Sequence, residues 1–255
     1  MKTKILAIFA CLLWGSAFAG AKIGFEYTTP LHLSGMRFML AGLLLIPFLI
    51  YQKIDWISNL KEWRYMLLFG FLQTFIQYGF FFMGLNKVPA AISAIIIGGG
   101  PFFVAVMAHF TMGNDRMSFR KILAIVLGMA GIVFISFAKG GSIHTDISFY
   151  YGVILLIISN IVGASTNIIV AKNRNKVSPV MLTAFANFSG GLILYIVSFF
   201  TEDWYVKPYS LEFYIAWIWL ALIPAVGFSI WYSLLKRPEV KVSELNRNFH
   251  FWSLK

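Results

Sequence analysis

The sequence has little charge. Only 12% of its 255 residues are Asp, Glu, Lys or Arg, whereas 59% are hydrophobic. A soluble domain of this length carries about twice that charged share. The apolar residues gather in runs of about 20, which is long enough to cross a ~30 Å hydrocarbon core. The sequence therefore predicts an all-α polytopic membrane protein whose main partner is the lipid bilayer.

The sequence also lacks the residues of most catalytic and metal sites. Cysteine occurs once, at Cys11, which excludes an internal disulfide, and no Cys/His cluster has metal-ligand spacing. Neither a Walker-type phosphate loop nor a Gly-x-Ser-x-Gly elbow is present. We therefore expect no enzyme, no catalytic residue, no metal and no cofactor.

Acidic residues are missing from the apolar runs. Eight membrane spans are predicted, at about residues 5–23, 31–50, 65–86, 89–110, 121–138, 149–171, 180–200 and 213–235. All Asp and Glu residues lie outside or at the edges of these spans, so an embedded carboxylate proton relay has no candidate. This absence weakens the case for proton antiport.

The net charge of +11 comes from basic residues in the short gaps between spans. Sixteen of the 21 Lys and Arg residues lie in alternate gaps and at the two ends, against four in the opposite gaps. This bias sets the orientation of membrane proteins and does not indicate a nucleic-acid partner. We expect a multi-pass protein of the cell (inner) membrane with a cytoplasmic N-terminus and C-terminal tail. The opening "MKTKILAIFACLLWGSAFAGA" could pass for a signal peptide, but we interpret it as the first span.

A shift of 149 residues superimposes the chain on itself. It places Thr29-Pro30-Leu31 on Ser178-Pro179-Val180 and Lys87-Val88-Pro89 on Lys236-Arg237-Pro238. The shift covers five predicted helices, an odd number, so the second copy must be inverted in the membrane. We expect two repeats, residues 1–148 and 149–255, with substrate bound between them near the midplane, as in many secondary transporters.

Several segments resemble the EamA-like family of drug/metabolite transporters, notably "LLWGSAFAGAKIG", "TPLHLSGMRFMLAGLLLIPF", "GLNKVPAAISAIIIGGGPFFVAVMAHF" and "RKILAIVLGMAGIVFI". The resemblance extends to about residue 245. It implies two five-helix repeats and commonly the export of amino acids or other small metabolites. It implies ten helices, whereas we count about eight. Applied to the fourth and fifth spans, the shift of 149 residues predicts the two missing spans near 238–259 and 270–287. We interpret the chain as a truncated or frameshifted member; a natural eight-helix relative is the alternative.

Polar side chains inside the spans are the candidates for substrate binding, because each needs a partner or water there. Gln73 and Gln77 share a helix face beside Tyr78, and Asn160, Gly163 and Asn167 form a second polar face. The remaining candidates are Trp14, Ser16, Ser93 and Asn187. These neutral groups suit a polar or zwitterionic solute. The structural alternative for all of them is hydrogen bonding between helices.

The glycine-rich stretch Gly98-Gly99-Gly100-Pro101 lies in mid-span and predicts a helix break whose freed backbone groups line a cavity. Close helix packing is the alternative. Pro224 allows a second break or a bend.

Arg37 is the one charge within a span, roughly 10 Å from its outer end. It could attract a substrate carboxylate. We favour the structural interpretation, in which it snorkels to the interface or caps helix ends.

The function that fits these features best is a secondary carrier, an exporter of a small polar metabolite such as an amino acid that works by alternating access. A non-transporting remnant or membrane scaffold is the alternative.

Small residues four apart suit close helix contacts, either within one chain or in a homodimer: Gly20 and Gly24, and Ala124 and Gly128.

Overall fold

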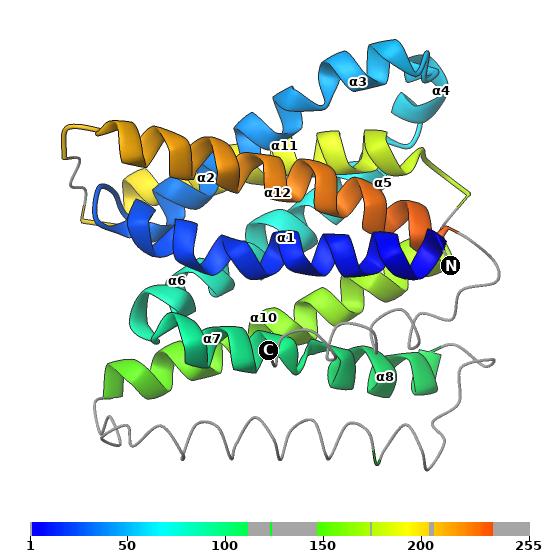
Figure 1. Ribbon diagram of the computed structural model, residues 1–255. Coiled ribbons are helices and arrows are strands. Elements are labelled where there is room, and N and C mark those ends of the chain that lie inside the picture. The colour runs from blue at the N-terminus through cyan, green and yellow to red at the C-terminus, as the bar shows by residue number, and fades with distance from the viewer. Residues whose placement is uncertain (1, 112–122, 124–146, 174, 204–206, 237–255) are drawn as a thin grey trace.

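The structure is a computed structural model that describes residues 2–111, 123, 147–173, 175–203 and 207–236, and within these ranges every regular element is a helix (Figure 1). The elements are α1 (Lys2–Phe25), α2 (Pro30–Leu44), α3 (Ile46–Tyr51), α4 (Trp56–Leu60), α5 (Trp63–Gly70), η1 (Phe71–Gln77), α6 (Tyr78–Lys87), α7 (Ala90–Gly98), α8 (Gly100–Thr111), α10 (Ile147–Lys172), α11 (Pro179–Thr201) and α12 (Leu211–Leu235).

Seven stretches in the described part are long and apolar enough to cross a membrane: Ile5–Phe25, Pro30–Tyr51, Trp63–Lys87, Ala90–Thr111, Ile147–Lys172, Pro179–Thr201 and Leu211–Leu235. They match seven of the eight predicted spans, which confirms the all-helical, multi-pass fold class. The eighth prediction, residues 121–138, falls almost wholly outside the described residues, as does the tail after residue 236.

Proline begins the second helix of each copy. Pro30 and Pro179 occupy the first turn of α2 and α11, where a missing N–H costs nothing. The free N–H groups of Leu31 and His32 instead donate to the carboxylate of Glu202, at 2.9 and 3.2 Å. Glu202 follows the last residue of α11, so this contact joins the start of α2 to the end of α11 and suits the positive end of a helix dipole.

The helices α2 and α11 cross closely through glycine. A Cβ added to Gly42 would lie 2.7 Å from Phe188 Cβ, and one added to Gly191 would lie 2.7 Å from the Met39 nitrogen. The shift of 149 residues turns the first contact into the second, because it places Gly42 on Gly191 and Met39 on Phe188. Such reciprocal contacts are what a two-fold axis between the two helices requires. The division of the chain into two inverted repeats, residues 1–148 and 149–255, stays a prediction.

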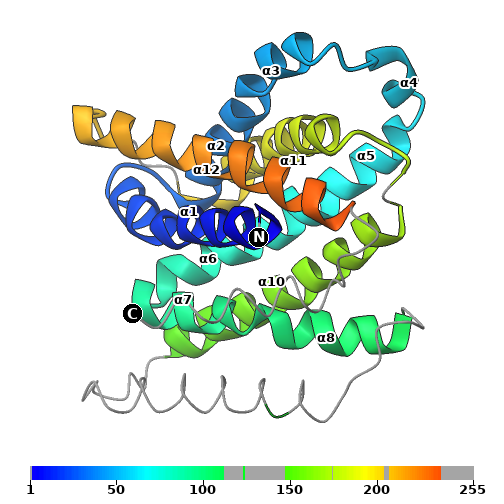
Figure 2. The ribbon, with the colours of Figure 1, turned by 45° about the vertical axis from the view of Figure 1, so that its right-hand side comes forward.

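The outer helices show the same relation. Helix α1 lies along α12 in both views (Figure 1 and Figure 2), and α10 correspondingly contacts η1 and α6. Trp14 of α1 packs on Gly227, whose added Cβ would lie 3.1 Å from the indole nitrogen. In the other copy Gly163 occupies the place of Trp14 and packs on Gln77. In both contacts a large side chain on one helix faces a glycine on the other: Trp14 faces Gly227, and Gln77 faces Gly163.

The third span of the first copy departs from regular α-helix, whereas α12 continues through Pro224 without interruption, so the helix break predicted at Pro224 is wrong. In the first copy seven residues, Phe71–Gln77, form a π-helix between α5 and α6. The shift places Phe75, within this segment, on Pro224 of α12, which lacks the N–H that would bond to Leu220. π-helical segments often lie at functional sites, and this one carries both Gln73 and Gln77.

Candidate functional site

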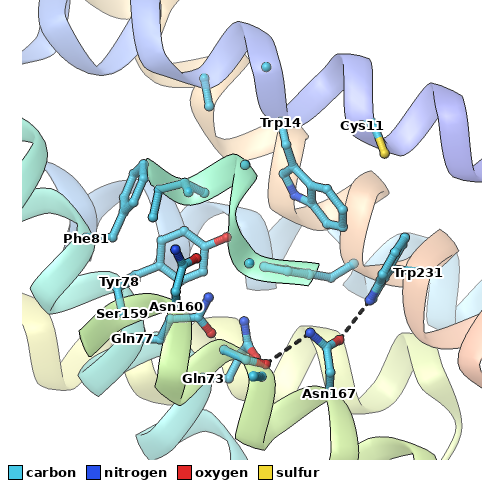
Figure 3. A pocket seen from close by; sticks show the side chains of 18 of the residues that line it. Cys11, Trp14, Gln73, Gln77, Tyr78, Phe81, Ser159, Asn160, Asn167 and Trp231 are labelled. Atoms are coloured by element: carbon cyan, nitrogen blue, oxygen red, sulfur yellow. Dashed lines mark hydrogen bonds between the residues drawn. The ribbon is translucent and has the colours of Figure 1, made fainter. Parts of the chain in front are cut away.

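A cavity of about 350 Å³ lies between the two copies. Its wall comes from α1, α2, η1, α6, α7 and α8 of the first copy and from α10 and α12 of the second. Figure 3 shows Trp14 above the site, with Gln77, Asn160, Gln73 and Asn167 below it and Trp231 to one side. The cavity thus has aromatic rings facing amide groups.

Most of the predicted binding residues lie in this wall: Trp14, Arg37, Gln73, Gln77, Tyr78, Asn160 and Asn167. Three of the predicted helix-break residues, Gly98, Gly100 and Pro101, line it as well. The structure therefore brings together polar groups from four different spans. Whether they contact a solute stays a prediction.

The other five predicted residues lie outside the wall. Asn187 is buried, and its Nδ2 has no hydrogen-bond partner among the described residues. The Ser16 hydroxyl donates to Leu13 O at 2.7 Å and accepts from Trp219 at 3.0 Å, and Ser93 donates to Val88 O at 3.4 Å. Gly99 forms the cap between α7 and α8, and Pro224 is buried within α12. Both serines use the bonds to backbone carbonyls that hydroxyls find easily within a helical span.

The glycine-rich stretch does break its span, since α7 ends at Gly98 and α8 begins at Gly100. Asn160 of α10 lies beside this break, donating from Nδ2 to Ile96 O at 2.7 Å. A Cβ added to Gly98 would meet nothing within 4 Å, and one added to Gly100 would meet only Asn160. Gly98 and Gly100 are thus not packed on a neighbouring backbone, which favours the cavity-lining interpretation over close helix packing.

A chain of hydrogen bonds joins α10 to η1 and α12. Asn167 donates to Gly163 O at 3.0 Å and accepts from the Trp231 indole at 2.8 Å (Figure 3). Thr166 donates to Gln73 Oε1 and also contacts Gly163 O at 2.9 Å. Gln73 and Asn167 therefore do form hydrogen bonds between helices, which was the structural alternative to substrate binding. Both also line the cavity.

Gln77 differs, because its Oε1 is buried without a hydrogen-bond partner among the described residues. Its Nε2 packs so closely on α10 that a Cβ added to Gly163 would lie 2.6 Å away. The side chain is therefore fixed in place while its acceptor oxygen stays available. The hydroxyl of Tyr232 is likewise buried and has no hydrogen-bond partner among the described residues.

Arg37 does not snorkel. Its side chain is only 1% exposed and lines the cavity. The guanidinium carbon lies 4.5 Å from the ring centre of Phe38, 5.1 Å from that of Phe82 and 5.8 Å from that of Tyr78. Two of its nitrogens, Nε and Nη1, are buried without a partner in the described ranges. The preferred structural interpretation, at an interface or a helix end, is therefore wrong about where this charge lies.

Sequence reasoning missed much of the aromatic wall. Phe228 lies between three other rings, with its centroid 5.5 Å from Trp14, 5.9 Å from Tyr78 and 5.4 Å from Tyr232. Trp231 packs edge-on against Trp14 at 5.4 Å. These residues lie one to two turns after Pro224 in α12. Their position in the repeat, just after this proline, was the sequence signal that could have identified them as cavity residues.

Lys22 joins α1 to the end of α6 beyond the residues of α1 that line the cavity. Its ammonium, near the end of α1, donates to Leu85 O at 2.6 Å and Val88 O at 3.0 Å, at the end of α6. Lysine suits this place because the carbonyls at a helix C-terminus carry a partial negative charge. The cavity residues on α1, Cys11 to Phe18, all precede it.

Comparison with known proteins identifies the family. A sequence model of the EamA-like transporter family matches residues 1–137, more than half of the chain. The chain belongs to the EamA-like transporter family. This EamA-like transporter is 25% identical over 235 residues to the protein named Uncharacterized transporter YvbV of Bacillus subtilis (strain 168), covering 92% of the chain and 75% of that protein. The chain is accordingly a transporter and not an enzyme.

Two further likenesses concern function and fold. The EamA-like transporter is 29% identical over 133 residues to a protein of Escherichia coli (strain K12) named Probable amino-acid metabolite efflux pump, covering 52% of the chain and 42% of that protein. A solved crystal structure superimposes with a TM-score of 0.79 at 17% identity, covering 97% of the chain and 84% of the other. That likeness supports the fold alone.

The small residues proposed for helix contacts are used within the chain where the structure describes them. A Cβ added to Gly20 would lie 3.2 Å from Leu220, and one added to Gly24 would clash with the side chain of Leu33. Ala124 and Gly128 lie outside the described residues. The homodimer stays a prediction.

Proposed function

We propose that this transporter is a secondary carrier that exports a small polar metabolite, such as an amino acid, by alternating access. One observation carries the proposal: a cavity between two inverted copies holds buried acceptors, among them Gln77 Oε1 and the Tyr232 hydroxyl, that have no partner among the described residues. Unpaired buried polar groups are costly. A bound solute can satisfy them. The named efflux function of the Escherichia coli relative supports the same conclusion.

The two copies, residues 1–148 and 149–255, would rock about the α2–α11 crossing. That crossing suits a pivot because backbone and Cβ atoms meet there without flexible side chains between them. The π-helix of the first copy and Pro224 of the second offer matching points where the third spans can bend. Such rocking of one repeat against the other around a fixed site is the usual form of alternating access.

The orientation follows from the basic residues, which place the N-terminus and the tail in the cytoplasm. The Lys22 bonds to α6 then lie toward the external end, beyond the residues of α1 that line the cavity, and would close the cavity to the outside. In this state the site would load from the cytoplasm, as an exporter requires. A reporter fused after Arg174 should be cytoplasmic and one fused after Glu202 external; an external signal at Arg174 would contradict both the orientation and the inverted repeat.

Transport itself is tested in inside-out vesicles, where export is seen as uptake. We expect vesicles containing the chain to take up solutes from a radiolabelled mixture of amino acids. Gln77→Ala should lower uptake about five- to 150-fold, the range for losing one buried hydrogen bond, here the bond from the solute to Gln77 Oε1. Gln52→Ala is the matched control, because Gln52 is exposed at the end of α3. No uptake by the wild type, or equal loss in both variants, would contradict the proposal.

A further inference from the structure

We propose that Arg37 binds the carboxylate of the transported solute, so that the carrier selects solutes that bear one such group. The inference rests on the proposed function and names the substrate class of the same cavity. Its basis is that a buried cation lines the cavity with two of its nitrogens, Nε and Nη1, left without a partner in the described part of the chain.

The charge of Arg37 is not neutralised within the described protein. The described acidic residues lie outside the spans or at helix ends. Glu202, at the nearer end of the bundle, is already engaged by the N–H groups of Leu31 and His32. A buried ion that lacks a paired charge is strongly disfavoured unless something completes it. A solute that enters the cavity with a negative group would do so.

The surroundings favour a carboxylate over a neutral oxygen. Three aromatic rings surround the guanidinium, of Phe38, Tyr78 and Phe82. The guanidinium is buried among them, and in a low-dielectric site the attraction between opposite charges is stronger than in water. Aromatic faces also stabilise the cation itself, which explains how the charge is held while the cavity is empty.

The charge also makes the cavity asymmetric. The repeat shift places Arg37 on Ala186, so the second copy supplies no equivalent charge. The faces of Trp14, Phe228 and Trp231 instead offer cation–π contacts to a positive group, and Gln77 Oε1 offers an acceptor. A solute with a carboxylate and an ammonium is therefore bound in one orientation, with its carboxylate at Arg37.

The decisive experiment compares amino acids with their C-terminal amides, which keep the size and the ammonium but lose the negative charge. Both compete with the uptake of a radiolabelled amino-acid mixture into inside-out vesicles. In the wild type the acids should compete about tenfold better or more, the range of a charged hydrogen bond. Arg37→Gln should abolish this preference, Arg37→Lys should keep part of it, and Arg64→Gln, which changes an exposed arginine, should leave it intact.

The outcomes separate this inference from the proposed function. Uptake in which acids and amides compete equally would overturn the role of Arg37 while transport stands. Absence of uptake would contradict the proposed function, and the thermal unfolding of the purified wild-type protein with acids and with amides then decides the inference. Stabilisation by acids alone supports it, and equal or no stabilisation overturns it. If Arg37→Gln fails to fold, acids and amides can still be compared on the wild-type protein, by competition for uptake and by thermal unfolding.

Discussion

Asn160 gives a sharp test of the broken helix. Its Nδ2 donates from α10 to Ile96 O at 2.7 Å, in the last turn of α7 before the interruption at Gly99. The same carbonyl also accepts from the Gly99 N–H at 3.1 Å, so Asn160→Ala removes one of two bonds and leaves no bare acceptor. Side-chain bonds between membrane helices contribute about 0.6 kcal/mol on average and at most about 1.7. We therefore expect uptake to fall about three- to 20-fold, as the break loses its fixed geometry.

The assay is the uptake of radiolabelled amino acids into inside-out vesicles that contain equal amounts of inserted protein. Asn173→Ala is the matched control, because Asn173 donates to Ile169 O at 2.9 Å on its own helix and does not line the cavity. It should transport within about twofold of the wild type. The reasoning is refuted if Asn160→Ala transports as well as the wild type, or if both variants lose transport equally.

Three further variants test the fold and the site. Gly191→Ala should lower the unfolding temperature, because its Cβ would lie 2.7 Å from a backbone nitrogen, whereas Gly15→Ala, with nothing within 4 Å, should not. Trp231→Phe keeps a ring but loses the bond to Asn167, and should weaken uptake about two- to tenfold; unchanged uptake would make that bond dispensable. Lys22→Met should speed the labelling of the cavity by an externally added thiol reagent, and an unchanged rate would contradict closure by Lys22.

The spans were predictable because the bilayer fixes their length and proline marks their starts. The prediction of 180–200 meets α11 at Pro179–Thr201, and that of 31–50 meets Pro30–Tyr51. The π-helix Phe71–Gln77 was not predicted, since a change from i+4 to i+5 bonding leaves no mark on an apolar run. The third span was therefore expected as one regular helix.

The polar part of the site was predictable because amides are rare and costly in hydrocarbon. Gln73, Gln77 and Asn160 were found in this way and all line the cavity. Phe228 and Trp231 were missed because an aromatic residue in an apolar span packs against lipid or protein equally well. The environment of Arg37 depends on rings from two different spans, α2 and α6, which no local pattern brings together.

Cys11, the single cysteine of the sequence, lies in the cavity wall and offers the most direct test of the central claim that solute passes through this cavity. A methanethiosulfonate reagent would attach a group to the wall of a cavity of about 350 Å³. Uptake of radiolabelled amino acids into inside-out vesicles should be lost in the wild type after treatment and retained in Cys11→Ser. Full uptake by wild-type protein whose Cys11 is shown by mass spectrometry to be modified would contradict the account.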